Sequence, residues 1–159
     1  MNNTISRTAL DIMSRDIILV EEDTTITDVI ELFLEHKISC VPVVNKNKKL
    51  IGIVTKTDII GHFMDIDLDV SLKVHLKDVI EGISEQDESE ILAVTDLKVS
   101  SIMKPKPITI TENTSIESLA KIMIDHSIHR LIIEKDDAIV GIISTHDILY
   151  HVAGMDKNG

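Results

Sequence analysis

Two ten-residue stretches, 89 positions apart, decide the fold of this chain. The first is Leu50-Ile51-Gly52-Ile53-Val54-Thr55-Lys56-Thr57-Asp58-Ile59, and the second is Ile139-Val140-Gly141-Ile142-Ile143-Ser144-Thr145-His146-Asp147-Ile148. Each begins as a short apolar run, which is typical of a buried β-strand. Each then places a hydroxyl residue three positions before an aspartate, which is typical of a helix N-terminus. Both stretches therefore predict a strand that leads directly into a helix.

The residues around these stretches repeat as well. A shift of 90 positions pairs Ile12-Met13 with Ile102-Met103, and the pairing continues up to Ile38 and Ile128. The second copy is then one residue shorter in a turn, so a shift of 89 pairs the residues that follow, up to His62 and His151. The two shifts give thirteen identities, most of them at apolar or turn positions. Such self-similarity indicates two copies of one unit. Because a unit of about 50 residues buries little surface alone, we expect the copies to pack sheet against sheet.

The first copy predicts the order strand, helix, strand, strand, helix. Residues 17–20 are a β-branched run, and apolar residues at helical spacing indicate a helix from Thr25 to about His36. Two further strands follow at 40–44 and 50–54, and the last helix begins near Thr55.

The second copy predicts the same elements. Thr114 and Glu117 form the expected capping box of its first helix, and its last helix begins near Ser144. Its strands are expected at residues 108–110, 131–133 and 139–143. The fold class is therefore α/β (α+β), built from two β-α-β-β-α units.

An acidic insert separates the copies, so the chain divides into residues 1–62, 63–98 and 99–159. The insert holds ten acidic residues and three lysines, which is −7 of the net charge of −11. Apolar residues interspersed in it predict a helical, docked part, whereas residues 84–90 are expected to form a solvated loop.

Composition excludes several classes of protein. The 159 residues are 43% hydrophobic and only 2% aromatic, which favours an aliphatic core. A net charge of −11 repels phosphate backbones and anionic lipids, so we expect neither nucleic-acid nor membrane binding. The single cysteine, Cys40, excludes an intramolecular disulfide and is expected to be buried. The polar N-terminus does not fit a secretory signal, and no apolar run reaches about 20 residues, so we expect a cytoplasmic protein.

The repeated pattern resembles the CBS motif, which occurs in tandem pairs called Bateman modules. The matching residues cover about two-thirds of the chain and lie at 12–13, 38–44, 50–59, 102–103, 128–133 and 139–148. The resemblance implies two pseudo-twofold-related units with two clefts between them. It also implies a regulatory module, often a homodimer, that binds an adenosine ligand such as AMP, ADP, ATP or S-adenosylmethionine, with no covalent cofactor.

The same resemblance implies roles for the two hydroxyl–aspartate pairs. Asp58 and Asp147 would hold the ribose hydroxyls, with Thr55 and Ser144 assisting. The spacing alone favours a helix capping box, which needs no ligand. The two roles are compatible, because a carboxylate at a helix N-terminus stays ionised and can accept two hydrogen bonds from a diol.

The copies differ most at His129 and Arg130, where the first copy has Ser39 and Cys40. In related modules, basic residues at this position contact the phosphates of a ligand whose ribose the other copy holds. The resemblance therefore assigns His129 and Arg130 to the Asp58 cleft. The alternative is an arginine paired with a surface acid and a histidine at a strand end. The converse expectation is unequal occupancy, with the Asp147 cleft binding weakly or staying empty.

Aliphatic residues are expected to sandwich the adenine, although core packing alone would explain each of them. They are Ile17, Ile18, Ile38, Val41, Pro42 and Ile53 in the first copy and Pro107, Ile108, Ile128, Leu131 and Ile142 in the second.

Three classes of function remain open. The leading one is a sensor of an adenosine ligand that acts through an unknown partner protein or by rearranging an oligomer. An enzyme is disfavoured, because the sequence has no Gly-rich phosphate loop, nucleophile elbow or metal-ligand cluster. The third is an oligomerising scaffold, or a module that responds to divalent cations, with empty nucleotide clefts.

Overall fold

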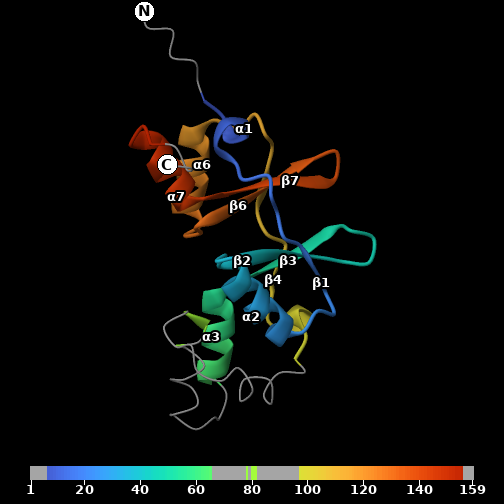
Figure 1. Ribbon diagram of the computed structural model, residues 1–159. Helices are drawn as coiled ribbons and strands as arrows, with labels where there is room; N and C mark the ends of the chain where they lie inside the picture. Colours follow the sequence, from blue (N-terminus) through green and yellow to red (C-terminus); the bar gives the residue numbers. More distant parts are fainter. Residues whose placement is uncertain (1–6, 66–77, 79, 82–96, 156–159) are drawn as a thin grey trace, which may run out of the picture. The chain divides into compact units, whose positions relative to one another are not determined.

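The computed structural model describes residues 7–65, 78, 80, 81 and 97–155 (Figure 1). These residues form two compact units. The first-repeat unit consists of the described residues within 18–106, and the second-repeat unit of those within 1–17 and 107–159. Each unit combines one small β-sheet with helices, which confirms the predicted α/β class.

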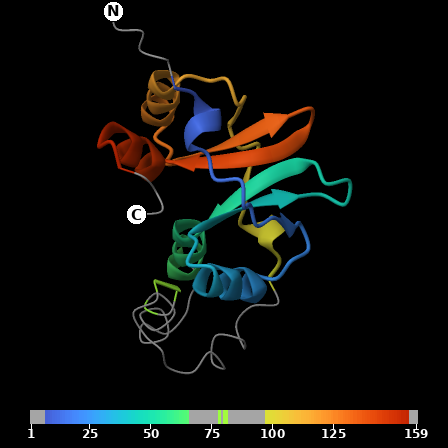
Figure 2. The same cartoon turned by 45° about the horizontal axis from the view of Figure 1, so that its top comes forward.

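The first-repeat unit contains a sheet with the strand order β1-β2-β3-β4. Strand β1 runs parallel to β2, whereas β3 is antiparallel to both β2 and β4. Helices α2 and α3 cover one face of β2 and β3 (Figure 2). The elements are β1 Val20–Glu21, α2 Ile26–Glu35, β2 Cys40–Val44, β3 Leu50–Thr55, α3 Lys56–Asp65, the 3-10 helix η1 Val99–Ser101 and β4 Lys104–Pro105.

The second-repeat unit contains a sheet with the order β5-β6-β7, in which β5 is parallel and β7 antiparallel to β6. Asp136 and Asp137 join β6 to β7 with φ of 51° and 62°, the left-handed pair typical of a tight hairpin turn. The elements are α1 Ala9–Ile12, β5 Thr109–Ile110, α6 Ile116–Asp125, β6 Arg130–Lys135, β7 Ala138–Ser144 and α7 Thr145–Val152. The predicted order of strand, helix, strand, strand, helix is confirmed in both repeats.

Two local predictions are wrong. The first strand begins at Val20 rather than at residue 17, because only Val20 and Glu21 find ladder partners, in Val43 and Val44. The N-cap of α6 is Ser115, whose hydroxyl accepts from the Ser118 amide at 3.3 Å.

Thr114 is not the cap of α6 because it closes a turn instead. Its amide donates to the Thr111 carbonyl at 3.1 Å, and its own carbonyl accepts from the Ala9 amide at 2.8 Å. Its backbone is therefore already committed one residue before the helix begins.

The opening segment of each repeat lies in the unit of the other repeat. Helix α1 and Ser14, from the first repeat, belong to the second-repeat unit, where Ser14 pairs with Ile142 of β7. Likewise η1 and β4, from the second repeat, belong to the first-repeat unit, where Lys104 pairs with Ile53 of β3. The ranges 1–62, 63–98 and 99–159 therefore follow the repeat in the sequence, whereas the compact units do not.

Close packing at two glycines holds these exchanged segments in place. A Cβ on Gly141 would lie 2.5 Å from Met13 Sδ, and a Cβ on Gly52 would collide with Met103 Sδ. Both methionines thus occupy space that any side chain at the glycine would need.

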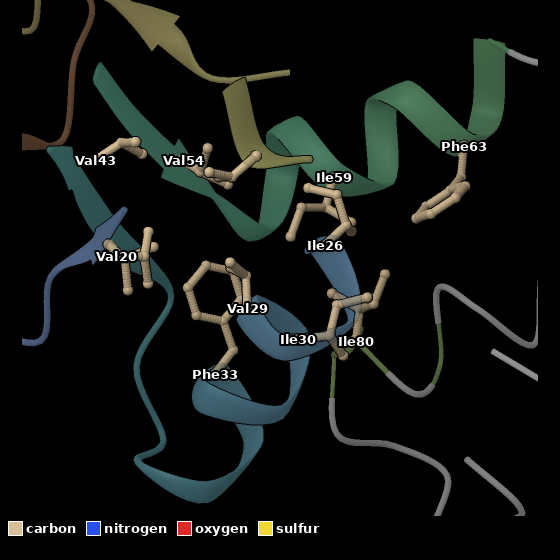
Figure 3. Packing of buried hydrophobic residues seen from close by; sticks show 12 residues of the cluster. Val20, Ile26, Val29, Ile30, Phe33, Val43, Val54, Ile59, Phe63 and Ile80 are labelled. Carbon is tan, nitrogen blue, oxygen red and sulfur yellow. The ribbon is translucent and has the colours of Figure 1, made fainter. Parts of the chain in front are cut away.

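Each unit has its own aliphatic core. Figure 3 shows the core of the first-repeat unit, where one face of α2 packs against α3 and strands β2 and β3. Phe33 of α2 is 1% exposed and is the largest of the fully buried side chains. In the second-repeat unit, Leu119 of α6 packs with Leu131, Ile133 and Ile143 of the hairpin.

Most of the acidic insert lies outside the described residues, including residues 66–77 and the loop predicted at 84–90. Asp78 and Ile80 are helical, and Ile80 is buried in the core of the first-repeat unit (Figure 3). This agrees with the expectation that an apolar part of the insert docks.

Candidate functional site

The Thr55–Asp58 pair forms a reciprocal cap at the start of α3. Asp58 Oδ2 accepts from the Thr55 amide at 2.9 Å and from Thr55 Oγ1 at 2.6 Å, and the Asp58 amide donates back to Thr55 Oγ1 at 3.2 Å. The strand supplies Thr55 and the first turn of the helix supplies Asp58, where the positive end of the helix dipole favours a carboxylate.

The Ser144–Asp147 pair forms the same arrangement at the start of α7. Asp147 Oδ2 accepts from the Ser144 amide at 2.6 Å and from Ser144 Oγ at 2.9 Å. Asp147 is 6% exposed and is the buried charged residue of the second-repeat unit. The predicted capping boxes are therefore confirmed in both repeats, and each buries a carboxylate at a helix N-terminus.

Lys104 distinguishes the Asp58 site. Its ammonium lies 2.9 Å from Asp58 Oδ1, the carboxylate oxygen that Thr55 does not use. The Asp58 side chain is 8% exposed and the Lys104 side chain 72% exposed. The sequence interpretation missed this contact. The repeat did hold a signal for it, because the shift of 90 positions sets Lys104 against the uncharged Ser14.

His129 and Arg130 lie beside the other aspartate cap within their own unit. Arg130 begins β6 and pairs with Ser144, the N-cap of α7, and the His129 carbonyl accepts from the Thr145 amide at 3.0 Å. Their expected contact with a ligand at Asp58, which belongs to the first-repeat unit, stays a prediction.

The predicted aliphatic residues divide by strand face. Val41 and Leu131 are 0% exposed within the two cores, so they do not offer a surface to a ligand. Pro42 and Ile53 pair directly across β2 and β3 and lie on the sheet face opposite Val41 and the helices. Pro42 is nevertheless buried, whereas Ile53 is partly buried. The remaining residues are partly buried, namely Ile17, Ile18, Ile38, Pro107, Ile108, Ile128 and Ile142.

Other features have simpler roles. Cys40 is partly buried at the start of β2 rather than fully buried. Across the described ranges, no three His, Cys, Asp or Glu side chains are placed to hold a metal ion. Among the helices that the structure describes, none is long and apolar enough to span a bilayer.

The chain belongs to the CBS-domain family, because the family profile matches residues 9–65 and 99–154. The protein MJ1426 of Methanocaldococcus jannaschii is 33% identical over 153 residues, which cover 87% of each chain. The chloroplastic protein CBSX1 of Arabidopsis thaliana is 27% identical over 162 residues. That alignment covers 91% of this chain but only 62% of the plant protein.

Solved structures confirm the fold. CBSX2 in complex with AMP superimposes with a TM-score of 0.66 at 21% identity, covering 93% of this chain and 97% of that one. The CBS domain pair of MJ0100, in complex with 5′-methylthioadenosine and S-adenosyl-L-methionine, gives a TM-score of 0.68 at 23% identity and covers 92% and 96%. The chain is thus a tandem CBS pair.

Proposed function

We propose that this CBS pair is a regulatory module that binds an adenosine ligand and acts through a partner protein or by rearranging an oligomer. The observation that carries the proposal is the repeated buried carboxylate: each unit holds one at a helix N-terminus, in the same hydrogen-bonded setting. A carboxylate in this setting is suited to accept hydrogen bonds from a vicinal diol.

Ribose recognition then falls to Asp58 with Thr55 and to Asp147 with Ser144. We assign the phosphate contacts of the Asp58 site to His129 and Arg130, since a guanidinium can bind a phosphate with two parallel hydrogen bonds. AMP, ADP, ATP and S-adenosylmethionine share the ribose diol and differ in the charge of the group on the 5′ carbon of the ribose. They are therefore the ligands to compare. The complexes of CBSX2 and MJ0100 support this choice.

Signalling by such a module requires two conformations that the ligand binds unequally. The two compact units have separate cores, so a ligand that contacts both units would bias the equilibrium between two conformations of the chain. The size of the response is limited by the ratio of the ligand's affinities for the two states.

A thermal-shift panel tests the proposal. An adenosine ligand at one hundred times its Kd should stabilise the folded chain by about 2.7 kcal/mol, roughly 5–10 °C for a domain of this size. AMP, ADP, ATP and S-adenosylmethionine are compared with the guanosine and cytidine nucleotides of equal charge. Absence of a shift with every adenosine ligand at millimolar concentration would exclude the proposed function.

A second copy of the chain is the proposed occupant of the exposed apolar face of α7. Leu149 and Val152 lie one helical turn apart and are 58% and 75% exposed, and Met155 follows just beyond the helix. Large apolar side chains clustered in this way favour an interface. The homodimer that the CBS resemblance implies would cover them.

The mass of the chain in solution tests this assembly. Wild type should elute as a dimer in size-exclusion chromatography with light scattering, and Leu149→Asp with Val152→Asp should shift it to a monomer, because each aspartate would be desolvated in the interface. Leu19→Asp, at an exposed site in the first-repeat unit, is the control and should leave the dimer intact. A monomeric wild type contradicts the assembly.

A further inference from the structure

The Asp58 carboxylate already has a partner on the oxygen that a ribose would need. Oδ2 is engaged by the amide and hydroxyl of Thr55, which together cap α3. A diol that donates to both oxygens, or to Oδ1 alone, must therefore approach Oδ1. The Lys104 ammonium lies there, 2.9 Å away.

The backbone of Lys104 is held in the sheet, but its ammonium group can move away from Asp58. Lys104 lies in β4 with its Cα paired to Ile53, and the preceding Met103 packs on Gly52. The side chain beyond is 72% exposed on a flexible four-carbon stem. An ion pair with an exposed ammonium contributes at most about 1 kcal/mol, so a ligand can displace Lys104 from Asp58 at a small but measurable cost.

The second repeat provides an internal comparison. Ser14 pairs with Ile142 as Lys104 pairs with Ile53, and Met13 packs on Gly141 as Met103 packs on Gly52. Ser14 is therefore the structural equivalent of Lys104, and it brings no charge to the aspartate cap of its own unit.

We propose that Lys104 is a specificity-determining residue of the Asp58 site, which selects anionic adenosine ligands over neutral ones. Its ammonium competes with the ribose hydroxyls for Asp58 Oδ1. A neutral nucleoside that displaces the ammonium leaves it without a partner, whereas a nucleotide offers its phosphate on the same sugar as a new one. This inference rests on the proposed function and concerns which ligand that site accepts.

Calorimetric titration with AMP and with adenosine tests the inference. The titrations use Asp147→Asn as the background, so that only the Asp58 site is measured. Lys104→Ser, which copies the residue of the other repeat, should lower the ratio of AMP affinity to adenosine affinity about three- to fivefold. Most of the change should come from tighter adenosine binding. Lys104→Met, which keeps the apolar stem, should give the same result if serine destabilises β4.

Lys106→Ser is the matched control, because it removes the same charge two residues along the same segment. Its affinity ratio should stay within twofold of the background protein. A ratio that is unchanged in both Lys104 variants while AMP still binds would overturn the role of Lys104 alone. Equal changes in Lys104→Ser and Lys106→Ser would overturn it too, in favour of a general charge effect. Failure of every protein, wild type included, to bind either ligand would instead overturn the proposed function.

Discussion

Replacing Asp58 by asparagine is expected to weaken the binding of AMP about 10- to 100-fold. Hydrogen bonds to an ionised group contribute roughly 1.5–3 kcal/mol, and the amide nitrogen of asparagine cannot accept one from a ribose hydroxyl. The amide oxygen can still accept from the amide and hydroxyl of Thr55, so the cap of α3 is retained. The loss should therefore appear in affinity, measured by calorimetry, with little change in the melting temperature of the unliganded protein.

Asp147→Asn is the matched variant, and its effect on AMP binding should be smaller. The proposed phosphate contacts of His129 and Arg130 serve the Asp58 site, whereas the equivalent positions in the first repeat are the uncharged Ser39 and Cys40. Arg130→Ala should accordingly reduce AMP affinity in the same direction as Asp58→Asn. Equal losses from the two aspartate variants would contradict the proposed unequal occupancy of the two sites.

Replacing Phe33 by alanine is expected to destabilise the chain by about 3–5 kcal/mol, which is a large part of the stability of a typical domain. Phe33 is 1% exposed on the apolar face of α2, where it packs with residues of β2, β3 and α3 (Figure 3). Neighbouring aliphatic side chains cannot close the space that an aromatic ring leaves. Urea unfolding followed by circular dichroism measures the change as a lower midpoint.

The control for this substitution is Ile124→Ala. Ile124 lies on α6 and is 77% exposed, so its truncation should cost less than about 0.5 kcal/mol. Met123, the repeat equivalent of Phe33, is 5% exposed in the other core, and Met123→Ala should cost about 2–5 kcal/mol. A Phe33→Ala protein as stable as Ile124→Ala would show that the core assignment is wrong.

The fold was predictable at positions where the sequence repeat and the local capping pattern indicate the same element. The switch from an apolar run to Thr55 or Ser144 marked the strand-to-helix junction correctly, because the capping box depends on only four consecutive residues. The first strand was overestimated, because its length depends on a distant partner, β2. The cap of α6 was misplaced by one residue, because Thr114 and Ser115 both carry hydroxyls and only the backbone of the turn decides between them.

The site was predictable in its residue types and less so in its contacts. Thr55 and Asp58 were found from spacing, but the pairing of Asp58 with Lys104 joins residues 46 positions apart and requires β4 to lie beside β3. Val41 and Leu131 were grouped with possible ligand contacts, because an apolar strand residue gives no sign of which sheet face it occupies until the register is known.

A shorter ancestor with only one repeat would have lacked the segment that each sheet receives here from the other repeat. Its leading arm, corresponding to α1 and Ser14, would have had to bind its own sheet or that of a second molecule, because here each arm binds the sheet of the other repeat. Two such molecules could have traded arms, at the cost of depending on their concentration. Fusion of the two genes would have made that trade permanent within a single polypeptide.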